Sequence, residues 1–596
     1  MKTTNYIIGI DLGTTNCTMA YTSLGRGKHP EIIQFPIMQM SAFGVQEEHF
    51  SLPSFLYFPL EEEKEKHLFL DKKVSVGILA RERGSEIPGR VISSAKSWLC
   101  HDGVQRRDPL LPLDAEDNAI KISPVEAITE LLKHLQEVWN VKFPDDPFKE
   151  QTILITVPAS FDPAARQLVE ESAKLADYPE VILLEEPQAA FYAWLCREKE
   201  EWRSKLAVGD TVLVVDIGGG TSDFSLIRAE DDKGDLILKR LAVGTHLLLG
   251  GDNMDLSLAY LAKQKLEASN KSIDSSQMSE LVHRCRFAKE ELLKQGALEK
   301  VIVAVQGRGS KLIGGSCKVE LSREEILKYI VDGFMPLVEP TERSPVEKKL
   351  GIRQIGLPYA QDARISCQLA KFLSMTGEKE SASMDEFILP TAILFNGGAL
   401  KANALQERLI ELLNSWAKNL KKSPIKILDG VNLDYAVSVG SVYYGLSREG
   451  TGIRIRAGIS RSYFIGIESA GLAIPGIQPK VKALCVASFG MEEGDSVDIT
   501  GQEFTLLLGE LASFRFFSHS TEKFSNGLAP TPGVLLAECL DELRELHPIE
   551  TLLDKQGIEG SLVRVTLSSK VTELGSFQLW CRAQDGRKWK LEFDIR

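Results

Sequence analysis

Two short turns in the chain place a carboxylate directly beside glycine, a combination that suits a metal-bound phosphate. They are IDLGTTN, residues 10–16, and VDIGGGTSD, residues 215–223. Backbone N–H groups of a glycine-rich turn can point at phosphate oxygens, which a carboxylate such as that of Asp216 repels. Magnesium removes the conflict, because it keeps most of its water and needs only one or two nearby carboxylates. We therefore expect Asp11 and Asp216 to flank one Mg–polyphosphate, through water.

The segment after the second turn excludes a dinucleotide-binding loop of the Rossmann type. That loop needs a helix after its glycines, because the helix N-terminus holds the pyrophosphate. Here FSLIRAEDDKGDLILKRL, residues 224–241, alternates apolar residues around a DDKGD turn and predicts a β-hairpin. The last position of the GxGxxG pattern is Asp223.

The two turns sit in similar surroundings. A strand over 6–10, a turn over 11–15 and a strand over 17–21 are matched by the same order around 212–227, at an offset of 205 residues. Coincidence is the alternative explanation. We interpret the match as a duplication that predicts two similar subdomains facing each other, with the ligand between their turns.

The rest of the chain predicts a mixed α/β domain followed by a β-rich one. Apolar spacing and capping residues predict helices over 123–139, 163–176, 252–268 and 279–294, a buried strand over 153–161, and a strand, glycine turn and helix over 393–413. After about residue 447 short strands dominate, with a weak helical signal only over 534–546. The predicted division is 1–446, a linker over 447–458, and 459–596, with a polar loop over 379–386.

Composition excludes several classes of protein. The 596 residues carry a net charge of −13, which argues against a general affinity for nucleic acid or anionic membranes. The nine cysteines are odd in number and include no CxxC pair, so neither a disulfide framework nor a zinc knuckle is indicated. With no signal peptide and no long apolar run, we expect a cytoplasmic monomer without nucleic acid or membrane partners.

Five segments carry a resemblance to a known family. IIGIDLGTTNCTMAYT, ITVPASFDPAARQLVEESAKLA, LLEEPQAAFYAW, VVDIGGGTSDFSLI and LFNGGALKANALQERL resemble, in this order, motifs of the DnaK-type heat-shock chaperones, the heat shock protein 70 family. The resemblance covers about 1–445 and weakens from 457. It implies an actin-like (duplicated ribonuclease H-like) α/β ATPase domain, followed by an all-β, sandwich-like peptide-binding domain that lacks a helical lid.

The resemblance also implies ligands and roles. The ligands are ATP or ADP with Mg²⁺, and K⁺ is a further candidate ion. Lys96 would neutralise charge on the transferred phosphoryl group, while Arg166 and Pro187 would transmit the nucleotide state. The implied catalytic residues are Asp11, Lys96, Glu186, Asp216 and Thr221, with Asp11 and Asp216 holding the metal through water. The implied nucleotide contacts are Gly13, Thr14, Thr15, Asn16, Gly218, Gly219, Gly220, Gly250, Gly251, Arg286, Lys289, Glu290, Gly397, Gly398, Lys401 and Asp434.

The chain departs from the family where adenosine would bind. Arg286 stands where the family is acidic and Glu290 where it is basic, and these positions share one face of a helix. Lys401 replaces an arginine that stacks on adenine, and Ala399 replaces a serine. The phosphate and metal chemistry is therefore expected to be intact, with an altered adenosine clamp.

The predicted linker differs as well. GIRIRAGIS, residues 452–460, is basic, whereas the family's linker is acidic and leucine-rich. The leading hypothesis is a slow ATP-hydrolysing, chaperone-like protein whose partners are unfolded polypeptide and a co-chaperone or nucleotide-exchange factor. The alternatives are a non-catalytic nucleotide-sensing scaffold and a small-molecule kinase on the same fold.

Overall fold

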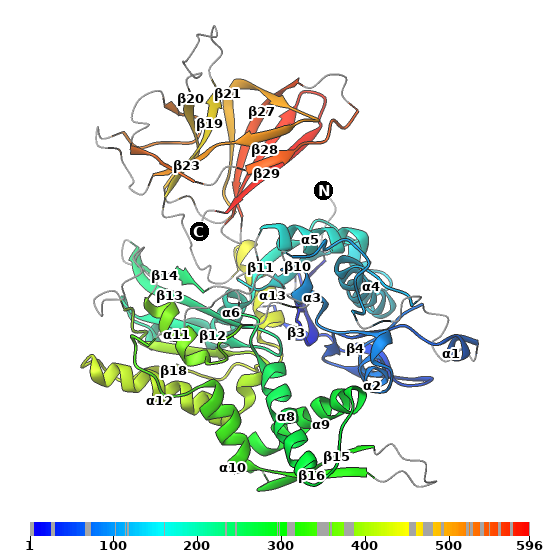
Figure 1. Cartoon of the computed structure of the whole chain (residues 1–596). Coiled ribbons are helices and arrows are strands. Elements are labelled where there is room, and N and C mark those ends of the chain that lie inside the picture. The colour runs from blue at the N-terminus through cyan, green and yellow to red at the C-terminus, as the bar shows by residue number, and fades with distance from the viewer. Residues whose placement is uncertain are drawn as a thin grey trace, which may run out of the picture. The chain divides into compact units, whose positions relative to one another are not determined.

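Two sheets in the computed structural model repeat one strand order (Figure 1). In the first, β11 (Ile182–Glu185), β10 (Thr152–Val157), β1 (Tyr6–Leu12), β2 (Asn16–Ser23) and β3 (Ile33–Gln34) lie side by side. In the second, β18 (Lys426–Leu428), β17 (Ala392–Asn396), β12 (Thr211–Ile217), β13 (Ser222–Asp232) and β14 (Asp235–Val243) do the same. In both sheets the central strand has one neighbour of each direction. β1 pairs antiparallel with β2 and parallel with β10, and β12 pairs antiparallel with β13 and parallel with β17. The predicted duplication and the predicted hairpin are both present.

The chain groups into two units, residues 1–236 with 240–454, and residues 237–239 with 455–596. The structure describes residues 5–25, 30–65, 73–101, 103–113, 115, 119–159, 161, 163–232, 235–244, 247–294, 296, 298–306, 316–342, 357, 360–374, 387–451, 461–468, 481–489, 491, 494–519, 524, 528–536, 542–546, 549–557, 562–572 and 576–594.

The register of the two sheets puts the two carboxylates at equivalent places. Asp11 of β1 lies opposite Thr156 of β10, and Asp216 of β12 lies opposite Asn396 of β17. Each carboxylate thus stands near the carboxyl end of a central strand, opposite a polar residue in the last two positions of the neighbouring strand. Turns at this edge of the sheets are where ligands of open α/β sheets bind.

The long helices form close to where the sequence predicts them. They are α4 (Pro124–Lys142), α5 (Pro163–Leu175), α8 (Gly251–Ala268), α9 (Ser275–Leu293) and α12 (Asn403–Asn419). The N-terminus of α4 is fixed by a capping box, in which Ser123 Oγ accepts from Glu126 N and a Glu126 carboxylate oxygen accepts from Ser123 N.

Two further helices change sheets. α6 (Glu186–Glu198) follows β11 of the first sheet, and besides β10 and β11 it packs against β12, β13 and β17 of the second. α13 (Ala436–Arg448) follows β18 of the second sheet but packs against β1, β2 and β10 of the first. The helices cross so closely that a Cβ on Gly440 would lie 1.7 Å from the carbonyl oxygen of Ala189. Each half of the first unit is therefore covered by a helix that the other half supplies.

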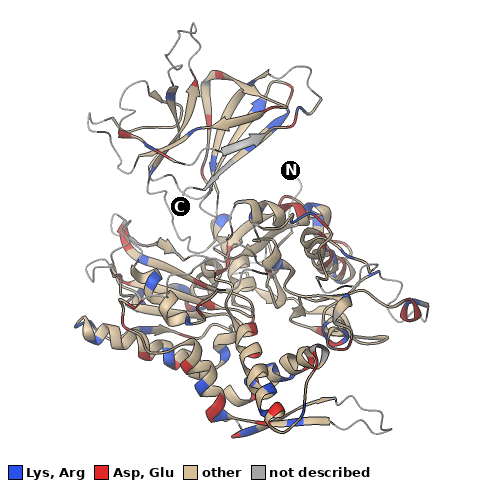
Figure 2. Ribbon diagram, in the orientation of Figure 1, with Lys and Arg blue, Asp and Glu red and all other residues tan. Residues whose placement is uncertain are grey.

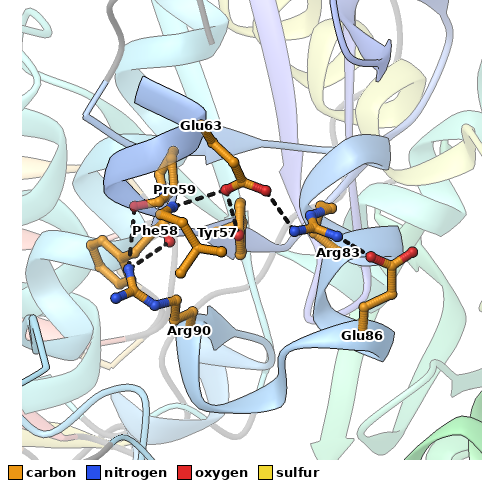
Figure 3. A network of polar contacts seen from close by, with 8 residues as sticks. Tyr57, Phe58, Pro59, Glu63, Arg83, Glu86 and Arg90 are labelled. Atoms are coloured by element: carbon orange, nitrogen blue, oxygen red, sulfur yellow. Dashed lines mark hydrogen bonds and ion pairs between the residues drawn. The ribbon is translucent and has the colours of Figure 1, made fainter. Parts of the chain in front are cut away.

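A smaller polar network braces the part of the chain around α1 (Glu61–Glu65) and α2 (Ile78–Glu86) (Figure 3). Glu63 Oε2 accepts from Tyr57 OH at 2.7 Å and from the Leu60 backbone N at 2.8 Å. Its other oxygen accepts from Arg83, which also pairs with Glu86. Because Arg83 belongs to α2, this network fixes α2 against α1 and β7.

The remaining elements of the first unit are short or peripheral. They are β4 (Ile37–Ala42), β5 (Val45–His49), β6 (Leu52–Pro53), β7 (Leu56–Tyr57), β8 (Ser75–Val76), β9 (Val91–Ile92), α3 (Ala95–Trp98), α7 (Trp202–Lys205), β15 (Lys300–Gln306), β16 (Ser316–Ser322), α10 (Arg323–Ile326) and α11 (Ile365–Ser374).

In the second unit every described element is a strand. One sheet runs β24 (Leu535–Leu536), β20 (Val481–Ala487), β19 (Ser462–Glu468), β23 (Phe516–His519) and β25 (Arg544–Glu545). Another runs β21 (Ser496–Leu507), β27 (Leu562–Val571), β28 (Ser576–Ala583) and β29 (Lys588–Asp594), and β22 (Leu511–Phe514) pairs with β26 (Ile549–Leu552). Apolar side chains of the two larger sheets, such as Ile465, Leu484, Leu567 and Phe577, share one core.

Several predicted details of this unit differ from the structure. β21 is longer than the short strands expected after residue 447, and its register shifts between Ile499 and Phe504. The weak helical signal over 534–546 is wrong where the structure describes it, since β24 and β25 lie there. The predicted polar loop over 379–386 and residues 452–460 of the basic linker lie outside the described residues, and α13 continues to Arg448.

Charge is mixed over the first unit. Figure 2 shows acidic and basic residues alternating along the same helices rather than separating by sign. No helix within the described ranges is long and apolar enough to cross a membrane.

Candidate functional site

One cavity of about 390 Å³ in the first unit collects the residues that the sequence singles out. Its wall includes both carboxylate turns and residues of α8, α9 and the turn after β17. All the predicted catalytic and nucleotide-contacting residues line it except Gly220 and Gly250. Gly220 lies next in the chain to lining residues on both sides, and Gly250 abuts Gly218 and Gly219.

A cluster of buried charges occupies one end of this cavity. Asp216 is 7%, Glu186 9% and Lys96 3% exposed. Burial, followed by the negative charge of Glu186, raises the pKa of Asp11 and that of Asp216 from 3.8 to about 8 each. Removal of carboxylates from water disfavours their charged form, so a cation is needed to hold both ionised at neutral pH.

Lys96 supplies only part of that positive charge. Its ammonium group pairs with Glu186, the first residue of α6. Burial lowers the pKa of Lys96, but Glu186 and Asp11 outweigh burial and raise it. The side chain is aimed by α3, which begins after Ser94 in a left-handed conformation with φ of 54°. Such a conformation costs a non-glycine residue energy, so the surrounding structure must impose it.

Each carboxylate is oriented by the strand next to it. Asn396 Nδ2 donates to Asp216 Oδ2 at 2.6 Å, and Thr156 Oγ1 donates to Asp11 Oδ1 at 3.4 Å. Neither partner was predicted from the sequence. Their only signal is that each is a polar residue in the last two positions of a largely apolar strand.

Glycine is required where the turns approach each other. A Cβ on Gly219 would lie 1.8 Å from Thr15 Oγ1, and one on Gly397 would lie 2.5 Å from Asp216 Oδ1. Gly397 also has φ of 87°, which other residues rarely adopt. At Gly219 the backbone of the second half thereby comes into contact with the Thr15 side chain of the first, as a shared phosphate site requires.

The residues at this end fit a hydrated magnesium ion with phosphate. Thr15 Oγ1 and Asn396 Oδ1 are buried and have no hydrogen-bond partner within the described structure, and both residues line the cavity. Among the described residues no three acidic, histidine or cysteine side chains converge to hold a metal directly. Magnesium held here would therefore take most of its ligands from water and phosphate, with Asp11 and Asp216 beyond that water.

The cavity wall beside the Gly218–Gly219 turn, where Asp252 N donates to the Gly219 carbonyl at 2.7 Å, carries charges that pair with one another. Arg286 lies 3.6 Å from Asp252, 3.7 Å from Asp255 and 3.8 Å from Glu290, from Nη2 or Nε to a carboxylate oxygen. Lys289 Nζ pairs with Asp255 Oδ1 at 2.7 Å and donates to the Gly251 carbonyl at 3.1 Å. The exchanged charges of Arg286 and Glu290 therefore form part of one ion network between α8 and α9.

Lys401 and Asp434 form a separate pair on the cavity wall. Neither is buried, since their side chains are 53% and 40% exposed. Further lining residues that the sequence analysis missed are Thr18, Ser51, Met254, Leu293, Lys294, Asn396, Ala402, Leu405, Leu433 and Val437.

The two residues expected to transmit the nucleotide state lie outside the cavity wall. Arg166 of α5 is 2% exposed and its Nη2 lies 3.7 Å from Glu185 Oε1. Glu185 directly precedes Glu186 and Pro187 at the start of α6. Arg166 thus pairs with the side chain of the residue two positions before Pro187.

Comparisons with known proteins identify the family of the chain. The family described as Hsp70 protein matches residues 7–355. The "Chaperone protein HscA homolog" of Pasteurella multocida (strain Pm70) is 30% identical over 380 residues, which cover 56% of this chain and 55% of that protein. The "Chaperone protein HscA" of Photorhabdus laumondii is 28% identical over 313 residues, 50% of this chain and 44% of that protein.

The chain spans about half the length of the curated relatives it matches. The family match covers more than half of this chain, including both carboxylate turns, Lys96 and the charged face of α9. The chain belongs to the Hsp70 family.

Proposed function

We propose that the chain binds ATP with Mg²⁺ in the cavity, hydrolyses it slowly, and couples hydrolysis to polypeptide binding by its second unit. The carrying observation is the convergence of Asp11, Asp216, Lys96 and Glu186 on one cavity whose wall is formed by glycine turns from both halves. The first unit would then be an actin-like ATPase domain, and the second a peptide-binding domain.

The proposal assigns each group at the buried end a task. Asp11 and Asp216 would hold Mg²⁺ through water, and Mg²⁺ would supply positive charge against the phosphate oxygens. The backbone N–H groups of the glycine turns, with Thr14, Thr15 and Thr221, would hold the phosphates. Lys96 would stabilise negative charge on the transferred group, and Glu186 would orient the attacking water.

The coupling to polypeptide rests on the second unit and on the family. The two larger sheets of this unit share a core, and most described side chains of β19 and β20 are buried. The relatives are named chaperones. We propose unfolded polypeptide, with a co-chaperone or exchange factor, as the class of partner.

The test compares wild type with Asp216→Ala, and with Asp108→Ala as a matched control at an exposed position away from the cavity. Wild type and Asp108→Ala should both show Mg-ATP-dependent thermal stabilisation and slow release of inorganic phosphate. Asp216→Ala should lose both, because the buried carboxylate that faces the metal is gone. Stabilisation and phosphate release that are equal in all three proteins would refute the ATPase proposal.

The same measurement separates the alternative. A chain that is stabilised by Mg-ATP but releases phosphate no faster than Asp216→Ala is a nucleotide sensor without catalysis. Binding of a ligand to the native state alone must raise its apparent stability, so the thermal readout does not depend on turnover.

A further inference from the structure

The two ends of the cavity differ in the burial of their polar side chains, which are buried at the phosphate end, around Asp11 and Asp216, and exposed at the nucleoside end. We define the nucleoside end as the lining residues Glu290, Leu293, Lys294, Ala399, Lys401, Ala402, Leu405, Leu433 and Asp434. A nucleotide whose phosphates lie at the Asp11–Asp216 end would turn its base toward them. None of these residues is aromatic, and none is an uncharged polar residue.

The polar groups of the nucleoside end are all charged and largely in solvent. The side chains of Glu290, Lys294, Lys401 and Asp434 are between 40% and 60% exposed. Each already has a partner of opposite charge, namely Arg286, Glu291 and, for the last two, each other. The buried part of the wall is apolar, with Leu293 3% and Leu405 1% exposed.

Strong discrimination between bases needs a different kind of wall. A site rejects a wrong ligand by a factor of about 10⁴–10⁵ only when that ligand leaves buried polar groups of the site unpaired. Exposed charged pairs return to water or to each other at little cost, since such pairs contribute about 0–1 kcal/mol. An apolar wall offers adenine and guanine the same contact area.

We propose that the site recognises the Mg–triphosphate and does not distinguish the two purines. This inference rests on the proposed function, because it concerns the ligand of the same cavity. Adenine and guanine differ by the donors and acceptors on their pairing edges, and among the nine residues of the nucleoside end no buried side chain is polar.

The test measures dissociation constants of the full chain for Mg-ATP and Mg-GTP, with Mg-tripolyphosphate as a ligand without a base. The expected ratio between the two nucleotides is below 10. A preference of tenfold or more for either purine overturns the inference and leaves the proposed nucleotide binding standing. If neither nucleotide nor tripolyphosphate binds, the proposed function fails together with the inference.

Two variants test the ratio of the two dissociation constants, which a purely structural defect would leave unchanged. Asp434→Asn and Lys401→Met should change both dissociation constants by the same factor and leave their ratio unchanged within about threefold. A tenfold change of the ratio in either variant would show that this pair reads the base, and would overturn the inference. Asp216→Asn, at the phosphate end, should weaken both nucleotides together.

Discussion

The two ends of the cavity place similar side chains in opposite surroundings. At the phosphate end Asp216, Glu186 and Lys96 are less than 10% exposed, and neighbouring strands or turns hold them. At the nucleoside end Glu290, Lys401 and Asp434 are at least 40% exposed and pair in water. A buried charge has a large desolvation cost, so it indicates that a ligand of opposite charge binds there. An exposed ion pair contributes little to the free energy of folding or binding.

The difference teaches where selectivity should reside in this chain. Groups that pay a desolvation cost are stabilised only by a ligand of matching charge, here a cation with phosphate. Groups in solvent impose no such demand. Changes at the phosphate end should therefore have large effects, and changes at the nucleoside end small ones.

The largest expected effect is on the rate of hydrolysis in Lys96→Met. The variant removes a buried cation from the position of charge development, so we expect the turnover number to fall by about 10²–10³. Nucleotide affinity should change by less than about tenfold, because the glycine turns remain. Single-turnover phosphate release and equilibrium binding separate the two quantities. A loss of nucleotide affinity as large as the loss of turnover would show that Lys96 also binds the nucleotide before hydrolysis.

The next effect is a pH dependence of stability from Asp11 and Asp216. Their pKa values are raised from 3.8 to about 8 in the folded chain. The folded ligand-free chain therefore binds more protons than the unfolded chain between these values. These groups contribute stability that is fully present below pH 3.8 and is lost as the pH rises through about 8.

Thermal unfolding from pH 5 to 9 measures this dependence, since each extra proton corresponds to about 1.4 kcal/mol per pH unit. Asp216→Asn should reduce the slope of ligand-free stability against pH. In wild type the stabilisation by Mg-ATP should grow from pH 6 to pH 9, because the bound cation no longer competes with protons. Equal slopes in the two proteins would contradict the assignment.

The smallest effect is expected for Lys401→Ala at the nucleoside end. Its pair with Asp434 is half exposed, so the free energy of unfolding should change by less than about 1 kcal/mol. Affinity for Mg-ATP should fall only a few-fold, by isothermal titration. A loss as large as that of Asp216→Ala would abolish the contrast between the two ends.

The parts of the fold that could be predicted depend on local patterns. Ser123 with Pro124 and Glu126 gives the start of α4 from four residues of sequence. The alternation after Gly220 gives the hairpin of β13 and β14. The duplicated turns predict that Asp11 and Asp216 share a cavity. The catalytic and binding roles carried over from the resemblance remain predictions, as do the domain boundaries at 446 and 458.

The parts that could not be predicted depend on partners distant in the chain. Asn396 contacts Asp216 because β17 pairs in register with β12, 180 residues apart. The apolar faces of α6 and α13 predict that these helices are buried, but not which sheet covers them. The pairing of Arg286 with Asp252 and Asp255 likewise needs the packing of α8 on α9.

The exchange of α6 and α13 has a consequence for the order in which the chain is made. The first sheet has all its strands once β11 has been synthesised, at Glu185, yet the helix that covers Ile7 and Gly9 ends at Arg448. Synthesis proceeds from the N-terminus at about 5–20 residues per second. For the time needed to add those residues, the first half exposes an apolar sheet face. A chain whose relatives are named chaperones thus passes through a stage in which it exposes an apolar sheet face of its own.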